Sequence, residues 1–438
     1  MNPPRPRDPG PPVRLGLVCP PLSGHLNPAL ALGRKLVDRG YSLTYFGVLD
    51  AERAVRSAGI EFVPLATSEY PLGETPRRMQ RLGELSGWAA LKYVLTCLQE
   101  ENQVHLRELP RALSEARMEG MILDQIGHGA VSVAQHLGLP YATACHALAL
   151  HADPALPPFN ECWEHRSTVG ARLRNQLAYL FGRPLLAWYF GSLNVQRRLW
   201  ALPPLHANDQ GESPLLQLSQ QPAGFEFPGR RFPDCFRFTG PWTLPDARIP
   251  VTFPWECLNG RPLIYASLGT LQNRLYDVFR TIAAACVGLD AQLVISLGSA
   301  QAPDWPGLPG HPLVVKFAPQ LELLRRAHLV ITHAGLNTTL ESLREGVPLV
   351  AIPIANDQPG VASRVKYLGA GEFVPVKRLT EARLRVAVRK VLENPSYRNV
   401  ARRFQQEIAQ ADGLNRAADL VERFLVTEVR RWRPKPSF

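Results

Sequence analysis

The sequence has no long apolar run that is free of charged residues. None reaches the roughly 18 residues that a membrane-spanning helix requires. The first twelve residues, MNPPRPRDPGPP, have no apolar segment of the kind found in secretory signals, so we expect a disordered tail over residues 1–12. These absences favour a cytoplasmic protein and leave open a peripheral contact with the inner membrane face.

Cysteine is scarce and scattered. The seven cysteines lie at positions 19, 97, 145, 162, 235, 257 and 286, and no two of them form a CxxC pair. An odd number without regular spacing does not fit a disulfide framework. We therefore expect reduced thiols, as in a cytoplasmic protein.

Several motifs of common enzyme classes are missing. The sequence contains no GxGxxG, no GxxxxGK[ST], no HExxH and no GxSxG. Their absence argues against a dinucleotide oxidoreductase, a P-loop NTPase, a zinc protease and an α/β-hydrolase.

The composition that is present is typical of a large globular protein. The chain has 438 residues, of which 45% are hydrophobic and 20% are charged. At roughly 100–200 residues a domain, this length predicts two domains or three. The net charge of +11 is spread along the chain and is not gathered beside a recognised module. We therefore expect no nucleic-acid partner.

Short apolar runs alternate with helical spacing in two separate stretches. This alternation predicts an α/β protein with two Rossmann-like, doubly wound domains that face each other across a cleft, over residues 13–239 and 255–414. The proline-rich residues 240–254 predict a linker, and residues 415–438 a C-terminal helix with a basic tail. The predicted strands are 13–18, 42–46, 61–64, 121–123, 141–144, 263–267, 292–296, 313–317, 329–332 and 347–352. The predicted helices are 29–39, 51–58, 130–137, 276–287, 338–345, 381–394 and about 415–430.

Residues 154–205 combine aromatic and basic side chains. Their helical spacing predicts two helices, over 170–181 and 185–199. Such a pair fits an ordinary helical excursion packed on its domain, the wall of an acceptor pocket, or an element that lies on a membrane surface. The sequence leaves these three interpretations open.

The segment THAGLNTTLE, at positions 332–341, follows a predicted strand and opens a predicted helix. Backbone N–H groups at a helix N-terminus suit a phosphate, and Gly335 allows a close approach. His333 can donate a hydrogen bond or carry positive charge, and Glu341 can accept from ribose hydroxyls. An ordinary helix could equally use Asn337 or Thr338 as its N-cap, with no ligand involved. However, residues 317–320 and 354–358 end two further strands at the same edge of the sheet.

These segments resemble the nucleotide-sugar signature of the family 1 glycosyltransferases, which have the two-domain GT-B fold. The resemblance implies a UDP-sugar donor, with Phe317 stacked on uracil and Gln320 at the edge of that base. It implies that Glu341 binds the ribose and that Asp357 and Gln358 hold the sugar hydroxyls. The other donor-binding residues that it implies are Ser267, Gly269, Thr270, Ala318, His333, Gly335, Leu336, Asn337 and Thr338.

The loop PPLSGHLNP, after the first predicted strand, resembles the loop of this family that carries its base. The resemblance implies that His25 takes the proton of the acceptor hydroxyl, for which an imidazole that titrates near neutral pH is suited. It implies that Asp124 orients and stabilises this imidazole. In-line attack would convert an α-linked donor into a β-linked product. We interpret His128, nearby in sequence, as structural.

The chain has no DxD motif to hold a divalent ion on the diphosphate. A helix N-terminus and neutral donors can take that role. We therefore expect a metal-independent reaction with no cofactor besides the UDP-sugar co-substrate.

Within the family, the strings YASLGTLQN at 265–273 and DQPG at 357–360 look most like those of bacterial carotenoid glucosyltransferases of the zeaxanthin type. This likeness implies a lipophilic small-molecule acceptor. A flavonoid, a sterol, or a macrolide or other polyketide is the alternative acceptor.

Other activities on the same fold agree less well with the sequence. Epimerases lack an acceptor-activating histidine in this loop, and phosphorylases carry a pyridoxal-phosphate lysine in a long C-terminal domain. A non-catalytic paralogue that binds a nucleotide sugar remains as an alternative. The presence of His25, Asp124 and the donor-binding set argues against it.

Overall fold

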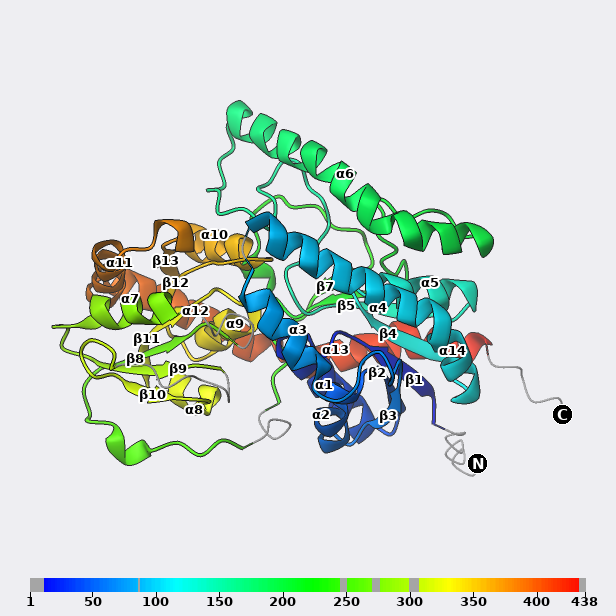
Figure 1. Cartoon of the computed structure of the whole chain (residues 1–438), viewed down its shortest axis with the longest axis horizontal. Coiled ribbons are helices and arrows are strands. Elements are labelled where there is room, and N and C mark those ends of the chain that lie inside the picture. The colour runs from blue at the N-terminus through cyan, green and yellow to red at the C-terminus, as the bar shows by residue number, and fades with distance from the viewer. Residues whose placement is uncertain (1–11, 86, 245–249, 270–275, 299–306, 433–438) are drawn as a thin grey trace, which may run out of the picture.

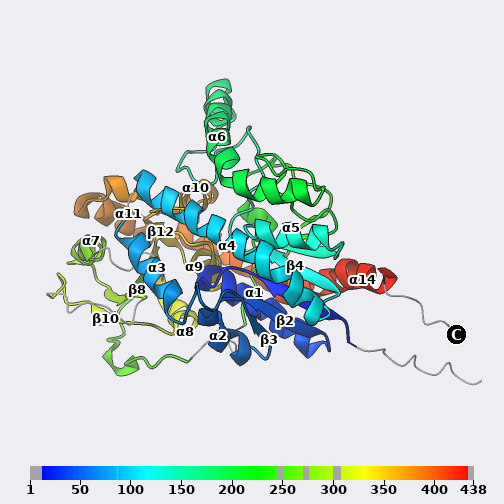
Figure 2. The same ribbon diagram turned by 45° about the vertical axis from the view of Figure 1, so that its right-hand side comes forward.

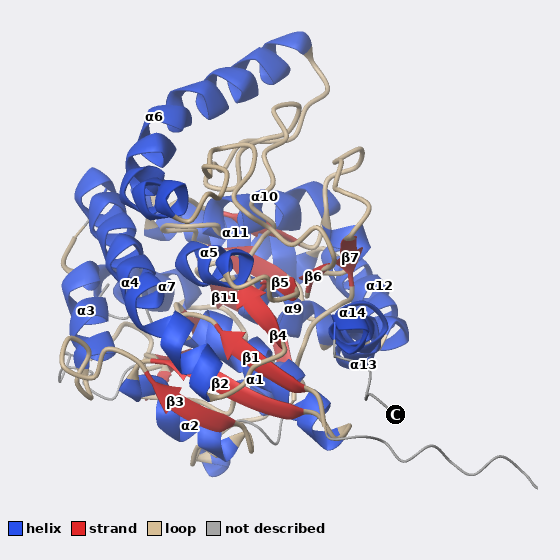
Figure 3. Ribbon diagram, turned by 90° about the vertical axis from the view of Figure 1, so that its right-hand side faces the viewer, coloured by secondary structure: helices blue, strands red, loops and turns tan. Residues whose placement is uncertain are grey.

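The computed structural model describes residues 12–432 except 86, 245–249, 270–275 and 299–306. Two parallel β-sheets lie side by side, the first on the right and the second on the left of Figure 1. Helices lie on both sides of the strands (Figure 3). This arrangement confirms the predicted α/β class with two doubly wound domains.

The first sheet has seven strands in the order β3-β2-β1-β4-β5-β6-β7, and every neighbouring pair is parallel. The strand order reverses between β1 and β4, which is where ligands bind in open α/β sheets. The strands are β1 (Arg14–Val18), β2 (Ser42–Gly47), β3 (Glu61–Pro64), β4 (Gly120–Asp124), β5 (Tyr141–Cys145), β6 (Gln217–Ser219) and β7 (Phe236–Phe238). The helices among them are α1 (Ser23–Asp38), α2 (Glu52–Ser57), α3 (Glu74–Gly83), α4 (Gly87–Glu115), α5 (His128–His136) and α6 (Val169–Leu199).

The second sheet has six parallel strands in the order β10-β9-β8-β11-β12-β13, with its reversal between β8 and β11. The strands are β8 (Leu263–Ser267), β9 (Gln292–Ser296), β10 (Leu313–Val315), β11 (Ala327–Thr332), β12 (Leu349–Ala351) and β13 (Gly371–Phe373). The helices are α7 (Tyr276–Cys286), α8 (Gln320–Leu324), α9 (Leu336–Arg344), α10 (Gln358–Leu368), α11 (Glu381–Glu393) and α12 (Pro395–Ala411).

The end of the described chain returns to the first domain. Helices α13 (Gly413–Leu420) and α14 (Thr427–Trp432), joined by a π-helical stretch over Val421–Val426 and coloured red in Figure 1, pack on the first domain. Their apolar side chains join the core that contains strand β1 and helix α1. In the opposite direction, Leu148 and Phe225, which belong to the first domain, pack into the core of the second domain. Each domain therefore completes the core of the other.

The structure differs from the sequence-based prediction in several elements. Helix α1 begins at Ser23, six residues before the predicted start at 29 and on the other side of Pro28. The two helices predicted over 170–181 and 185–199 form one helix, α6, which continues through Pro184. The elements that the sequence pattern did not predict are α3, α4, α8, α10, α12, β6, β7 and β13.

Part of the predicted organisation stays a prediction. The tail expected over residues 1–12 lies outside the described residues except for position 12, and so do positions 245–249 of the expected linker. The sheets fall on either side of residues 240–254. Among the described residues, no helix is both long enough and apolar enough to cross a membrane.

Candidate active site

A hydrogen bond joins the two predicted catalytic residues, of which Asp124 is buried and His25 is half-buried. His25 lies in the first turn of α1, after the loop that follows β1, and Asp124 is the last residue of β4. Because β1 and β4 are neighbours at the reversal of the sheet, their carboxyl ends bring the two side chains together. The His25 Nδ1 lies 2.7 Å from Asp124 Oδ2. The other carboxylate oxygen accepts the backbone N–H of Ile126 at 3.0 Å.

The charges of this pair are coupled. Burial opposes ionisation of Asp124, but the neighbouring imidazoles outweigh it and hold the pKa of the carboxyl well below its usual range. Burial also lowers the pKa of His25, but the attraction of Asp124 exceeds this effect and raises the pKa above its ordinary value. Nδ1 of His25 donates to the carboxylate, so Nε2 is the atom left to accept a proton.

A second imidazole, which the sequence analysis missed, binds the same carboxylate oxygen. His146 Nδ1 lies 2.6 Å from Asp124 Oδ2, and its ring is buried. Burial lowers the pKa of His146, so the ring is neutral near pH 7. A signal for it exists, because His146 directly follows β5, the strand that pairs with β4.

His25, Asp124 and His146 also form the one group in the described residues whose ligand atoms could hold a metal, all within 4.8 Å of one another. Their Nδ1–Oδ2 separations are hydrogen-bond distances. We therefore interpret the cluster as a hydrogen-bonded proton site. Metal independence stays a prediction.

The loop between β11 and α9 holds His333 between two glycines. A Cβ added at Gly269 would lie 2.7 Å from His333 Cε1, and one added at Gly335 would lie 2.6 Å from Nε2. Only glycine fits at either position without displacing the imidazole. Burial lowers the pKa of His333 to about 4, so His333 is neutral near pH 7 in the ligand-free protein and can donate a hydrogen bond.

The side chains predicted to bind the nucleoside lie together beside this loop. Gln320 Nε2 donates to Glu341 Oε2 at 2.7 Å, and Gln320 Oε1 accepts from the Tyr265 hydroxyl at 3.2 Å. Phe317, three residues before Gln320, is 42% exposed, so a nucleotide base could stack on its ring. Thr338, on α9, lies 3.4 Å from the Gln320 amide.

Asn337 connects the donor loop to the helix that carries His25. Its Nδ2 donates to the Gly24 carbonyl at 2.8 Å. Pro28, four residues after Gly24, has no N–H for the usual helical bond to that carbonyl. Gln220, which the sequence analysis missed, donates to Asn337 Oδ1 and to the His146 carbonyl, both at 2.6 Å. The two predicted half-sites therefore meet in one network across the domain boundary.

Two further predicted residues lie at the same boundary. Asp357 Oδ2 accepts the backbone N–H of Leu148 at 3.1 Å, and burial raises the pKa of this carboxyl. Gln358 Oε1 accepts the N–H groups of Ile354 and Ala355. The Gln358 side chain therefore shapes its own loop and keeps its amide N–H₂ as a donor.

The structure places the remaining predicted residues differently. Leu336 is buried in the core of the second domain, so only its backbone can face a ligand. Ala318 packs on the same core. Ser267 Oγ accepts the Gly269 N–H at 3.3 Å, while Thr270 lies outside the described residues. His128 is buried against Tyr189, as its structural interpretation expects.

Two Rossmann-like domains, with a His–Asp pair on one and the residues predicted to bind a nucleotide on the other, are the arrangement of a glycosyltransferase of the GT-B type. The chain belongs to the family 1 glycosyltransferases: it is 31% identical to the zeaxanthin glucosyltransferase of Pantoea ananas over 94% of this chain and 95% of that one. Residues 280–421 match the family described as erythromycin biosynthesis protein CIII-like, C-terminal domain.

Solved structures agree with this assignment. The kitacinnamycin glycosyltransferase is 25% identical with a TM-score of 0.73, covering 94% of this chain and 98% of that one. A spinosyn rhamnosyltransferase solved with thymidine diphosphate has the same fold, with a TM-score of 0.66 at 17% identity and coverage of 93% and 100%.

Proposed function

We propose that this glycosyltransferase is inverting and metal-independent, and that it transfers a hexose, with glucose as the first candidate, from a UDP-sugar to a hydroxyl of a lipophilic small molecule such as a carotenoid. The observation that carries the proposal is the network from Asp124 and His25 to Asn337. It joins the proposed base to Asn337, one of the predicted donor-binding residues, across the domain boundary.

The proposed reaction moves one proton and exchanges one bond at the anomeric carbon. His25 Nε2 accepts the proton of the acceptor hydroxyl as its oxygen attacks the anomeric carbon. The bond from that carbon to the diphosphate oxygen breaks on the opposite face, which inverts the configuration. Asp124 stabilises the imidazolium that forms, through the 2.7 Å hydrogen bond at Nδ1.

The donor side would hold the leaving group without a metal. The N-terminus of α9 offers backbone N–H groups to the diphosphate, and the neutral His333 adds a donor. An approaching diphosphate would raise the pKa of His333 and strengthen that bond. Uracil is the proposed base, and the thymidine diphosphate bound by the spinosyn enzyme makes a TDP-sugar the alternative to test.

The acceptor is proposed from relatives and from the surface of α6. Two zeaxanthin glucosyltransferases, at 31% and 29% identity, favour a carotenoid. The match to a family described as erythromycin biosynthesis protein CIII-like favours a macrolide or other polyketide as the second candidate. A lipophilic acceptor resides in membranes, and α6 exposes an apolar face flanked by arginines, so we propose that this face contacts anionic lipid.

A UDP-release assay tests the function. Purified protein with EDTA and UDP-glucose or TDP-glucose would be given zeaxanthin, a flavonoid, a sterol and a macrolide. We expect release that depends on one apolar acceptor and that persists in EDTA. No acceptor-dependent release with either donor would contradict the proposal, and loss of activity in EDTA would contradict metal independence.

Two substitutions separate the base from the donor site. His25→Ala should lower transfer by at least about 100-fold, the usual contribution of a general base, and should leave UDP affinity nearly unchanged. Glu341→Ala should instead weaken UDP binding, measured by calorimetry. Full activity of His25→Ala would show that the base is wrongly assigned.

A further inference from the structure

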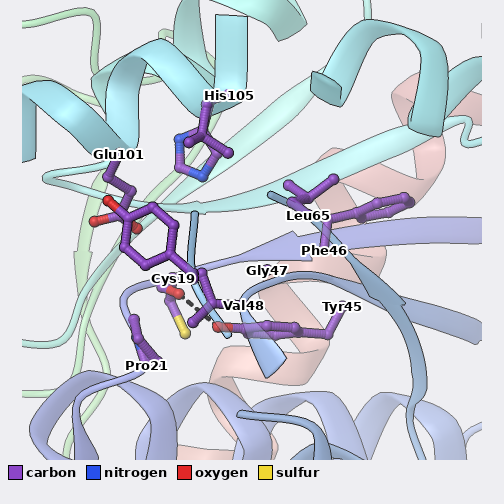
Figure 4. A pocket seen from close by; sticks show the side chains of 11 residues that line it. Cys19, Pro21, Tyr45, Phe46, Gly47, Val48, Leu65, Glu101 and His105 are labelled. Atoms are coloured by element: carbon purple, nitrogen blue, oxygen red, sulfur yellow. Dashed lines mark hydrogen bonds between the residues drawn. The ribbon is translucent and has the colours of Figure 1, made fainter. Parts of the chain in front are cut away.

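A pocket in the first domain lies beside the loop that leads to His25. Figure 4 shows Glu101 and His105 reaching from α4 toward Cys19 and Tyr45. Cys19 and Pro21 belong to the loop between β1 and α1, so the pocket adjoins the turn that holds the base. Its lining residues are Cys19, Pro21, Tyr45, Phe46, Gly47, Val48, Leu65, Tyr70, Glu101, Val104 and His105.

Three polar groups of this pocket have no partner within the described part of the chain. The Tyr70 hydroxyl and His105 Nδ1 are buried without a hydrogen bond, and the His105 side chain is 3% exposed. No described residue hydrogen-bonds the Glu101 carboxyl either. Tyr45, by contrast, donates to the Cys19 carbonyl at 2.7 Å. Buried polar groups are paired in the great majority of cases, so the two unpaired buried atoms, the Tyr70 hydroxyl and His105 Nδ1, leave this pocket able to bind a polar group beside the half-buried Glu101.

The charge state of the lining narrows the chemistry of that ligand group. Burial lowers the pKa of His105 to about 4 and raises the pKa of Tyr70, so both are neutral near pH 7. Burial, followed by the charge of Asp124, raises the pKa of Glu101 to about 7. The lining contains no Lys, Arg or Asp, and the rest of it is mainly apolar. Arg78 lies 4.4 Å over the Tyr70 ring but is not part of the lining, which offers an uncharged oxygen the Tyr70 O–H, a ring nitrogen and, when Glu101 is protonated, a second O–H donor.

We propose that Tyr70, Glu101 and His105 form a subsite for a second oxygen substituent of the acceptor, a hydroxyl or a keto group close to the hydroxyl that meets His25. The proposal rests on the proposed function and adds a selectivity to it. The enzyme then prefers apolar acceptors that carry two neighbouring oxygens over those with one. Glu101 acts as a specificity-determining residue of this subsite. It is close enough to His25 and Asp124 for their charges to influence one another.

Matched acceptor pairs test the subsite. One pair is zeaxanthin and astaxanthin, which has a keto group beside each ring hydroxyl, and another is 7-hydroxyflavone and 7,8-dihydroxyflavone. We expect the native enzyme to favour the second member of each pair in kcat/KM. Glu101→Leu should reduce this preference about tenfold, which corresponds to about 1.4 kcal/mol, and Tyr70→Phe should reduce it less. Glu101→Gln, which keeps a hydrogen-bonding group, should retain most of it.

The controls separate this proposal from the function on which it rests. Glu115→Leu removes an exposed carboxylate from the same helix and should leave the preference unchanged. Calorimetry of acceptor binding reports the preference even without transfer. Wild-type protein that binds both members equally, or Glu101→Leu and Tyr70→Phe variants that keep the full preference, would overturn the subsite. Absence of transfer to every acceptor would contradict the proposed function instead.

Discussion

Asp124 shares one oxygen between two imidazoles, and this sharing affects the pKa of His25, the proposed base. His146 donates to Oδ2 from a buried, neutral ring, while His25 donates to the same atom. The hydrogen bond from His146 stabilises the Asp124 carboxylate and so lowers its attraction for the proton on His25. Glu101 and Asp357 also act on His25 through their charges. His146 is therefore expected to keep the pKa of His25 lower than Asp124 alone would set it.

His146→Phe should shift the acid limb of the pH profile. With the His146 hydrogen bond gone, Asp124 holds the His25 proton more strongly and the pKa of His25 rises. The neutral imidazole needed for proton transfer is then lost at a higher pH, so activity falls earlier on acidification. A hydrogen bond to a charged group contributes about 1.5–3 kcal/mol, or about one to two units at about 1.4 kcal/mol a unit. Because only part of this energy acts on the His25 proton, a shift of up to about one pH unit is expected. The measurement is kcat/KM against pH.

His151→Phe is the matched control. It removes another imidazole, one packed against Phe232 and Phe236 with no hydrogen bond to Asp124 within the described residues. Its acid limb should coincide with that of the native enzyme. In an Asp124→Asn background, His146→Phe should no longer move the limb. An unchanged limb in the single variant would refute the proposed influence of His146 on His25.

The sequence was informative where a residue follows a strand and uninformative where a partner arrives from elsewhere. Asp124 and His333 could be placed because each ends a buried apolar run of a parallel sheet. The orientation of Leu336 toward the core could not be predicted, because the first residue of a helix can point either way. Gln220 was missed because β6 is only three residues long and gives no periodic signal.

At the scale of elements, α6 shows how a proline can mislead. Pro184 predicts a break because it lacks an N–H for the carbonyl of Leu180. Both residues lie on the exposed face, where water can bind the freed carbonyl. The second half of the helix is held by Tyr189, Phe190 and Leu193, which pack beside side chains of α4. Packing and solvation therefore keep one helix over Val169–Leu199.

The exposed face of α6 carries the proposed lipid contact. Figure 2 shows the helix standing out from the body of the molecule. Its exposed apolar side chains fall on one face at helical spacing, with Phe181 77% exposed, and its exposed arginines flank that face. The apolar residues of the face are Val169, Leu173, Leu177, Leu180, Phe181, Trp188, Val195 and Leu199. The flanking arginines are Arg172, Arg183 and Arg198.

Replacing Leu173 and Phe181 together by Glu should weaken binding to anionic vesicles at least tenfold in a co-sedimentation assay. The change removes buried apolar area and adds repulsion from the lipid charge. Val386→Glu, which alters an exposed apolar residue on α11, is the control and should bind as the native protein does. Equal binding of the double variant, or no binding by the native protein, would contradict the lipid contact.

At the scale of the whole molecule, a buried charge cluster fastens the two domains. Arg364 of α10 donates to Glu226 at 2.9 Å, and Arg230 donates to the other Glu226 oxygen at 2.9 Å. Arg364 and Glu226 are almost fully buried. Nearby, the Gly360 N–H donates to the Phe159 carbonyl, and a Cβ at Gly360 would lie 2.3 Å from that oxygen. The segments after β5 and β6 therefore hold α10 closely.

Arg364→Leu should lower the free energy of unfolding by about 3–5 kcal/mol, because it leaves the Glu226 carboxylate buried with one partner lost. Urea titration followed by tryptophan fluorescence measures the change. Lys366, on the same helix as Arg364, forms an exposed ion pair with Glu164. Lys366→Met breaks this pair and should cost no more than about 1 kcal/mol. Similar effects of the two substitutions would contradict a stabilising role for the buried cluster.

The packing of α13 and α14 on the first sheet has a consequence for how the protein is made. Val421, Leu425 and Val429 cover core side chains of a domain whose strands are synthesised some 200 to 400 residues earlier. On the ribosome, that core stays open while the whole second domain emerges. The nascent first domain would therefore present an uncovered apolar face until α13 and α14 emerge, and this is the interval in which a chaperone would have to shield it.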